Sequence, residues 1–309
     1  MKSPASYAVV TPARNEAENL PRLAESLRAQ HPPPSAWVIV DNESTDGTGD
    51  VVRQLIARDP WIRGVSAPEA EGIVRGGTVT RAFHAGLAAL DAGYDIVVKV
   101  DADVSFPPHH FERVLAAFAK SPDLGIASGV CLELSEAGGW QQRYTTAESA
   151  WGAARAYRRE CLEAVLPLEE RMGWDGIDSL KASLHGWRTQ TLDGIEFRHH
   201  RREGQRDGAR HRAWAAQGRA MHYMGYRWWY VVARALFHAR REPVALVMVA
   251  AFIASALRRE PICPDLGVRE QLRSRQTLRS LPRRLREARG VPAQIAGSGV
   301  PPGRGGYSR

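Results

Sequence analysis

The sequence predicts an α/β fold, with a mainly parallel central sheet flanked by helices and a basic helical extension. Three observations indicate it. Short apolar runs alternate with segments of helical period over about the first 200 residues. Three of these runs end in acidic or amide residues. Charge divides the chain, because residues 1–196 hold 19 basic and 27 acidic residues, whereas residues 197–309 hold 23 and 7.

The first elements follow from the apolar pattern. Tyr7–Val10 is a short apolar run, predicted as a strand that ends at Thr11-Pro12. Leucines then recur at helical spacing over Leu20–Leu27, and the prolines of His31–Pro34 end that helix. Trp37–Val40 has the composition of a buried strand.

The same alternation continues to residue 100. Apolar residues within Val51–Ile56 indicate a helix, and Ile62–Ser66 a strand. Ala82–Leu90 is predicted to be helical, and Ile96–Val100 to be a strand. Strands separated by helices of this length form a parallel sheet with right-handed crossovers.

The residues that follow three of these strands are polar. They are Asn15-Glu16, Asp41, and Asp101 with Asp103. In an open α/β sheet, ligands bind beyond the carboxyl ends of the strands. The sequence therefore predicts a site where these acidic strand ends meet.

The second part of the chain has a different pattern. Leu192–Phe197 is predicted as a last strand, and a basic, glycine-containing loop follows it. Three helices are predicted after this loop, at Arg212–Tyr223, Tyr226–Ala239 and Val244–Arg259. Glycine, proline and serine dominate the end of the chain. We expect a catalytic domain at 1–196, a helical extension at 197–290 and a disordered tail at 291–309.

Asp101 and Asp103 are the first candidates for metal binding. Two carboxylates at positions i and i+2 after a strand can hold Mg²⁺ or Mn²⁺, which prefer oxygen ligands. A cation at this place would offset charge on a diphosphate leaving group. The alternative is a turn in which each aspartate bonds to its own backbone.

Three motifs resemble a known family. Thr11–Glu16, Val40–Thr48 and Val100–Asp103 are similar to the nucleotide-sugar half of glycosyltransferase family 2, which has the GT-A fold. The resemblance covers about residues 5–200. It implies an inverting transferase that uses a nucleotide diphosphate sugar and a divalent cation, Mn²⁺ or Mg²⁺. Asn42-Glu43 replaces the usual Asp-Gly, which leaves the base preference open.

The resemblance also implies roles for single residues. Pro12, Glu16 and Asp41 would line the nucleoside pocket, and Arg14, within the first motif, is a further candidate for donor binding. Asp101 would lie near the ribose and the metal, and Asp103 would bind the metal.

An inverting transferase needs a base for the acceptor hydroxyl. The family commonly places a Glu-Asp pair in this region, and here Trp174 and Asp175 occupy the two positions. Asp175 is therefore the candidate base, with Asp178 as the second choice. The alternative makes Asp175 the N-cap of a helix over residues 176–185, with Gly186 as its stop.

Basic residues supply further candidates. Some GT-A enzymes take a third metal ligand from a histidine here, which favours His199, although a surface histidine pair is an equal alternative. Arg201 could bind diphosphate oxygens through its guanidinium. Arg75 and Arg81 are weaker candidates for the same role.

Several classes of protein are disfavoured. Cys131, Cys161 and Cys263 lie far apart, so neither a disulfide framework nor a structural zinc site is expected. No helix-turn-helix, zinc-finger or RNP-like signature accompanies the basic charge, and we expect no nucleic-acid partner. A sugar nucleotidyltransferase would carry a glycine-rich signature near its start, and this sequence has none there.

The expected location is the cytoplasm, with a peripheral position on the inner face of the cell membrane as an alternative.

The apolar stretch Pro243–Leu257 bears on that alternative. Its 15 residues carry no charge, and a spanning helix needs about 20. Flanking arginines and upstream aromatics favour a helix lying at an anionic membrane surface; packing on the catalytic core is the alternative.

Three functions are left open. The first is transfer to a hydroxyl of a glycan or of a lipid-linked acceptor. The second is transfer to a polyprenyl phosphate, which needs no base. The third is a non-catalytic, basic membrane-binding module on a nucleotide-binding scaffold.

Overall fold

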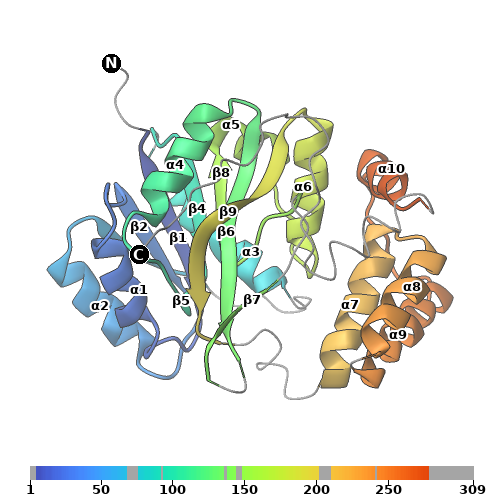
Figure 1. The fold of residues 1–309 in the computed structure, drawn as a ribbon. Helices are drawn as coiled ribbons and strands as arrows, with labels where there is room; N and C mark the ends of the chain where they lie inside the picture. The colour runs from blue at the N-terminus through green and yellow to red at the C-terminus, as the bar shows by residue number, and fades with distance from the viewer. Residues whose placement is uncertain are drawn as a thin grey trace, which may run out of the picture.

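The computed structural model describes residues 5–67, 76–91, 93–135, 138–143, 148–201, 210–240 and 242–277. A nine-stranded sheet forms the centre, and a group of helices stands beside it (Figure 1). The predicted α/β class with a carboxyl-terminal helical extension is confirmed. The predicted tail at 291–309 lies outside the described residues.

The first half of the sheet is parallel, as predicted. Its strands are β1 (Tyr7–Ala13), β2 (Ala36–Asp41), β3 (Ile62–Ser66) and β4 (Ile96–Val100), in the order β3-β2-β1-β4. The helices that connect them are α1 (Leu20–Arg28), α2 (Thr48–Arg58) and α3 (Gly77–Ala88). Every residue of β4 is buried, because helices cover both faces of a parallel sheet.

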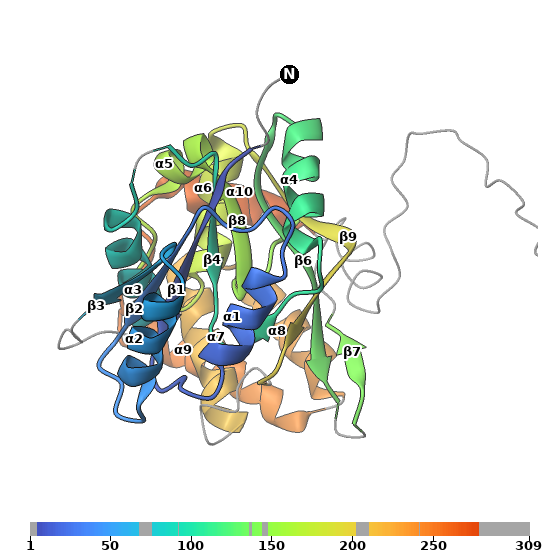
Figure 2. The same cartoon turned by 90° about the vertical axis from the view of Figure 1, so that its left-hand side faces the viewer.

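The second half of the sheet is mixed, so the description as mainly parallel holds only for the first half. The added strands are β5 (Val104–Ser105), β6 (Leu124–Leu134), β7 (Trp140–Gln142), β8 (Ala154–Arg158) and β9 (Arg188–His199). β8 is antiparallel to β4 and β6, whereas β6 and β9 are parallel. β7 pairs with the end of β6 at the edge of the sheet (Figure 2). β9 continues past residue 196 to His199, across the boundary that charge suggested.

Helices cover the two faces of the sheet in separate hydrophobic cores. α1, α2 and α4 (His110–Lys120) pack on one face, around residues such as Val9 and Phe111. α3, α5 (Arg159–Val165) and α6 (Trp174–Leu184) pack on the other, around residues such as Val10 and Phe83. Alternate residues of β1 therefore contribute to opposite cores, as the strand period requires.

The extension contains four helices among the described residues. They are α7 (Arg210–Met224), α8 (Trp228–Ala239), α9 (Val247–Leu257) and α10 (Leu266–Arg275). The helix expected at Val244–Arg259 is instead a 3₁₀ turn, Pro243–Leu246, followed by α9. Pro243 is compatible with this first turn because an amide hydrogen there would have no partner within the helix. α10 was not predicted.

The extension is anchored on α6. Met224 of α7 and Leu272 of α10 share a small core with Ile177 and Leu180 of α6. Figure 1 shows the α7–α9 group beside α6, away from the sheet. Among the described residues, the main contacts of α9 are with α7 and α8. Within the residues described, we find no helix with the length and apolar composition needed to cross a bilayer.

Candidate functional site

Three of the acidic strand ends lie at one edge of the sheet. β1 pairs in parallel with both β2 and β4, and Ala13 is opposite Asp41. The residues that follow the three strands therefore emerge on the same side. The fold thus brings Glu16, Asp41 and Asp101 to a common edge from three separate segments.

The loops after β1 and β2 are bonded to each other. Asn15 N donates to Ser44 Oγ over 2.9 Å, and Thr45 N donates to Asn15 Oδ1 over 2.8 Å. Glu16 N donates to Thr48 Oγ1 over 2.8 Å. Asn15 has a φ of 55°, in the left-handed region that asparagine tolerates well. These bonds join the loops after β1 and β2 into one rim, called here the joined rim. The sequence did not reveal that Asn15 and Thr48 connect the two motifs.

Asp101, Asp103 and His199 form a cluster of metal-binding character. Each offers one ligand atom, and the three atoms lie within 4.8 Å of one another. His199 Nε2 is 3.3 Å from Asp103 Oδ1. Two carboxylates and one imidazole are a donor set that suits Mn²⁺, and the carboxylates also suit Mg²⁺. The residues present therefore fit the cation that the motifs imply.

Neighbouring charges act differently on the two aspartates. Burial raises the pKa of Asp101, and the charge of Lys99 opposes this. Lys99 Nζ donates to Asp101 Oδ1, and also to Gly152 O over 2.8 Å. Burial also acts to raise the pKa of Asp103, but the hydrogen bond and charge of His199, with the charge of Arg201, lower it overall. Burial acts to lower the pKa of His199, yet bonds to Asp103, Cys131 and Glu133 raise it to about 12.

Glu16 and Arg201 connect the first strand end to this cluster. Arg201 Nη1 and Nη2 donate to the two carboxylate oxygens of Glu16 over 3.0 and 2.9 Å. Arg201 Nε is also 3.7 Å from Asp103 Oδ2. Glu16 is buried, and Asn19 Nδ2 donates to it over 2.7 Å. Arg201, which we expected at diphosphate oxygens, thus has two carboxylate partners in this structure.

The other residues of the first two motifs surround the joined rim. Pro12 is half-buried in β1, opposite Val40. Asp41 is half-buried, and its Oδ1 accepts a hydrogen bond from Ser44 N over 3.2 Å. Arg14 is exposed.

Asp175 lies in the first turn of α6. The N-cap of this helix is Gly173, whose φ of 92° suits glycine, so the alternative in which Asp175 caps the helix is wrong. Gly186, with φ of 81°, follows the end of the helix as predicted. A Cβ built on Gly152 would lie 3.5 Å from Asp175 Oδ2. Gly152 O also accepts a hydrogen bond from Lys99 Nζ, which in turn donates to Asp101. Asp175 therefore lies close to the Asp101 side of the cluster.

Asp178, the second candidate base, has the surroundings of a structural residue. Its exposed fraction is 1%. Arg155 donates to both its oxygens, from Nε over 2.9 Å and from Nη2 over 2.5 Å, and Tyr157 OH donates over 2.5 Å. Burial raises the pKa of Asp178 to about 6 against the effect of Arg155. These contacts tie α6 to β8, and they occupy the carboxylate that a base would need.

The remaining arginine candidates do not add to the cluster. Arg81 Nη2 donates to Glu170 Oε2 over 2.7 Å, at the surface. Arg75 lies outside the described residues.

Three site residues were missed. Lys99 had a signal, since a charged residue inside an apolar strand requires a partner when buried. The same signal would apply to Arg155, which is buried in β8, but that strand was not predicted. Glu133 had no signal, because its contact with His199 depends on strand pairing.

Comparison with known proteins agrees with the motifs. Residues 8–160 match the family model described as glycosyl transferase family 2. An undecaprenyl-phosphate mannosyltransferase of Micrococcus luteus is 36% identical over 119 residues, which cover 38% of this chain and 46% of the relative. A polyprenol monophosphomannose synthase of Mycolicibacterium smegmatis is 30% identical over 174 residues, covering 51% and 63%. The chain thus spans about half the length of these relatives.

Solved structures have the same fold as this chain, and the expected GT-A fold is confirmed. A mannosyltransferase from Pyrobaculum calidifontis, solved with GDP-Man and Mn²⁺, has a TM-score of 0.55 at 18% identity. The match covers 93% of this chain and 85% of that one. Staphylococcus aureus TarS (1–349), solved with UDP, has a TM-score of 0.51 at 15% identity.

Proposed function

Because residues 8–160 belong to glycosyltransferase family 2, we propose that this protein is a metal-dependent inverting transferase that moves a sugar from a nucleotide diphosphate sugar to a lipid-linked acceptor. The observation that carries the proposal is the convergence of three strand ends on one edge, beside the cluster of Asp101, Asp103 and His199. A protein that only bound membranes would have no need of these carboxylates.

Asp101, Asp103 and His199 are the residues that would hold Mn²⁺ or Mg²⁺. When bound, the cation would supply positive charge beside the diphosphate leaving group. Lys99 and Arg201 already contact these carboxylates and keep them from being unpaired charges at a partly buried edge. On this proposal Pro12 and Asp41 bind the nucleoside, and Glu16 with Arg201 holds the rim in place.

Asp175 is proposed as the base. In inversion, the acceptor oxygen forms its bond to the anomeric carbon on one face while the diphosphate leaves with the bonding electrons from the other. The hydroxyl proton must pass to a carboxylate within hydrogen-bond reach. Asp175 is half-buried in the first turn of α6, near Gly152, and its Oδ1 accepts only a local bond from Gly176 N among the contacts described.

Transfer to a polyprenyl phosphate is the second candidate. The Micrococcus and Mycolicibacterium relatives carry names of this class, as does a dolichol-phosphate mannosyltransferase of Pyrococcus furiosus. Such an acceptor is already ionised and needs no base. The two candidates therefore differ in their dependence on Asp175.

The lipid-linked acceptor is further supported by the surface of the extension. Leu246, Ala250, Ile253 and Leu257 are exposed at spacings of four, three and four residues, so they lie along one side of the α9 region. Arg258 and Arg259 follow it and are exposed. We propose that this surface, called here the α9 face, lies on an anionic membrane where such acceptors reside.

One experiment tests the metal and the donor together. UDP-, GDP- and dTDP-sugars should be screened for hydrolysis and thermal stabilisation with and without Mn²⁺, starting from GDP-mannose because three relatives are mannosyltransferases. We expect one donor to stabilise the protein only with Mn²⁺, and Asp103→Asn to abolish that effect. Asp123→Asn, an exposed aspartate paired with Arg188, is the control. Full activity of Asp103→Asn in EDTA would refute the proposed metal dependence.

A further inference from the structure

His199 is the last residue of β9, and it has neighbours on both sides. In the sheet, β9 lies between β6 and β5. Glu133 of β6 is its register partner on one side, and Val104 of β5 is its partner on the other. Asp103 immediately precedes Val104. The backbone pairing therefore places His199 between two carboxylates that come from different strands.

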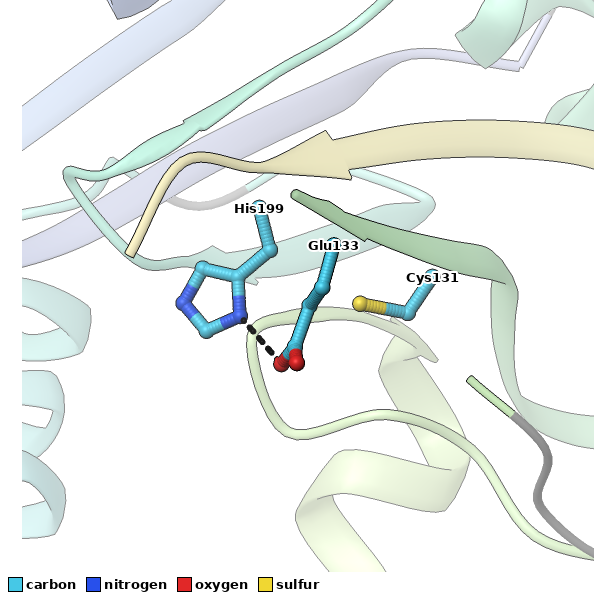
Figure 3. Close-up of side chains that lie close together, drawn as sticks. All are labelled: Cys131, Glu133 and His199. Atoms are coloured by element: carbon cyan, nitrogen blue, oxygen red, sulfur yellow. Dashed lines mark ion pairs between the residues drawn. The ribbon is translucent and has the colours of Figure 1, made fainter. Parts of the chain in front are cut away.

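The two ring nitrogens of His199 face these two carboxylates separately. Nε2 is 3.3 Å from Asp103 Oδ1, and Nδ1 is 3.4 Å from Glu133 Oε1. Figure 3 shows the Glu133 carboxylate beside the ring, with Cys131 two residues earlier on the same strand. The exposed fraction of the Glu133 side chain is 14%, so its carboxylate has little access to water.

We propose that Glu133 is the positioning residue of the metal cluster. It accepts the Nδ1 hydrogen of His199, so that Nε2, which faces Asp103, is the nitrogen that would give up its proton when a cation binds. Metal-ligating histidines generally donate their second N–H to a carboxylate or a carbonyl, which sets the tautomer and the ring orientation. This inference rests on the proposed function, because without a cation His199 has no ligand role to be positioned for.

A competing arrangement is a second metal site made of Cys131, Glu133 and His199, whose ligand atoms also lie within 4.8 Å of one another. Arg143 argues against it. Its Nη1 is 3.0 Å from Glu133 Oε1, the same oxygen that faces His199. The guanidinium and the imidazole thus both occupy that one oxygen of Glu133. Cys131, the third member, offers a buried thiol, which is not a ligand that Mn²⁺ or Mg²⁺ prefers. The structure therefore favours a positioning role.

The test is Mn²⁺ binding to the full chain, measured by titration calorimetry and by the electron paramagnetic resonance signal of free Mn²⁺. Glu133→Gln should weaken binding about 10- to 100-fold, the usual effect of losing such a partner. Glu133→Asp keeps the charge but withdraws it by one methylene, so it should also weaken binding. Glu112→Gln is the matched control, because Glu112 pairs with His109 at an exposed position and should leave the Kd unchanged.

Asp103→Asn is measured alongside and separates two kinds of failure. If Asp103→Asn weakens Mn²⁺ binding while both Glu133 variants bind within twofold of wild type, the positioning role is wrong and the metal site stands. If Glu133→Gln weakens binding but Glu133→Asp does not, the charge of Glu133 matters and its position does not, which also overturns the inference. If Asp103→Asn has no effect, the proposed metal site itself fails, and the positioning role with it.

Discussion

Asp175 and Asp178 are three residues apart on one helix, yet their environments assign them different tasks. Asp178 is enclosed by Arg155 and Tyr157, whereas Asp175 is half-buried near Gly152. A helix places residues three apart on the same side, so their different burial reflects depth along α6. The residue nearer the helix start is the one beside the strand ends.

The first prediction concerns Asp175→Asn. If the acceptor is a hydroxyl, kcat should fall by roughly 10²–10⁴ while the donor Kd is kept, because only the proton transfer is lost. Loss of an acid from the first turn of α6 should change stability by no more than about 1 kcal/mol. Steady-state kinetics, donor titration and thermal melting on one preparation measure all three. Retention of activity with a polyprenyl phosphate acceptor would select the second candidate function.

The second prediction concerns pH and His110. This residue is buried on α4, and its Nδ1 bonds to Glu196 O over 2.9 Å. Burial lowers its pKa from 6.5 to about 4. The unfolded chain therefore binds a proton below pH 6.5 that the folded protein does not bind until about pH 4. Stability should be fully present above pH 6.5 and should fall by about 3 kcal/mol as the pH drops to 4.

Urea denaturation at pH 7.5 and at pH 5 tests this expectation. His110→Gln cannot take up a proton, so it should lose less stability than the wild type over the same interval. His109→Gln, at the exposed neighbouring position, is the control and should behave as the wild type does. Equal pH dependence of all three proteins would contradict the role of His110.

At the scale of elements, α6 connects the catalytic domain to the extension. One side of the helix meets β8 through the Arg155–Asp178 pair. The other side of α6 meets α7, where Met224 packs against Gly173 and Gly176 at the start of α6. A Cβ atom added to Gly173 would lie 3.2 Å from Met224 Sδ, and one added to Gly176 would lie 2.9 Å from Met224 Cε. The position of the candidate base thus depends on the packing of α7.

The third prediction follows from this packing. Met224→Ala should lower the free energy of unfolding by about 2–5 kcal/mol and also lower kcat, because it leaves a cavity beside the first turn of α6. Met221→Ala is the matched control, since Met221 is equally buried on α7 but belongs to the core shared with α8 and α9. It should lose similar stability and keep kcat once both variants are assayed well below their melting temperatures. Equal kcat values for the two variants would show that α7 has no influence on Asp175.

At the scale of the whole molecule, charge and apolar surface are separated between the two parts of the chain. The catalytic part is acidic, and the extension is basic, as counted above. α9 uses Met248 and Ser255 as buried contacts and leaves the α9 face exposed. We propose that the extension holds the acidic site near a lipid-linked acceptor.

The fourth prediction is binding of the full chain to anionic vesicles and not to zwitterionic ones, with weakening as salt rises. Each arginine near an anionic surface contributes about 1 kcal/mol, and salt screens this contribution. Replacing Ile253 and Leu257, which are 50% and 80% exposed, with glutamine should abolish vesicle flotation without changing the melting temperature. Ile56→Gln, an exposed isoleucine of α2, is the control. Absence of flotation for the wild type at low salt would remove the membrane role.

The sequence by itself determined the parallel half of the fold and the residues at its strand ends. β1 to β4 and their helices have strong periodicity, and each strand end is local to its own motif. The strands β5 to β8 were not predicted. β5 and β7 have only two and three residues, and β6 is buried along most of its length, so it lacks the alternation of a half-buried strand.

Only the tertiary structure decided how the candidate residues combine. Glu133 and His199 are 66 positions apart and meet because β6 and β9 are paired in register. Asp178 was the second choice of base after Asp175, and only its contacts with Arg155 of β8 show a structural role. The local sequence specifies which side chains a strand end carries, but partner, burial and pKa depend on contacts between distant segments, and those contacts form only when the sheet is complete.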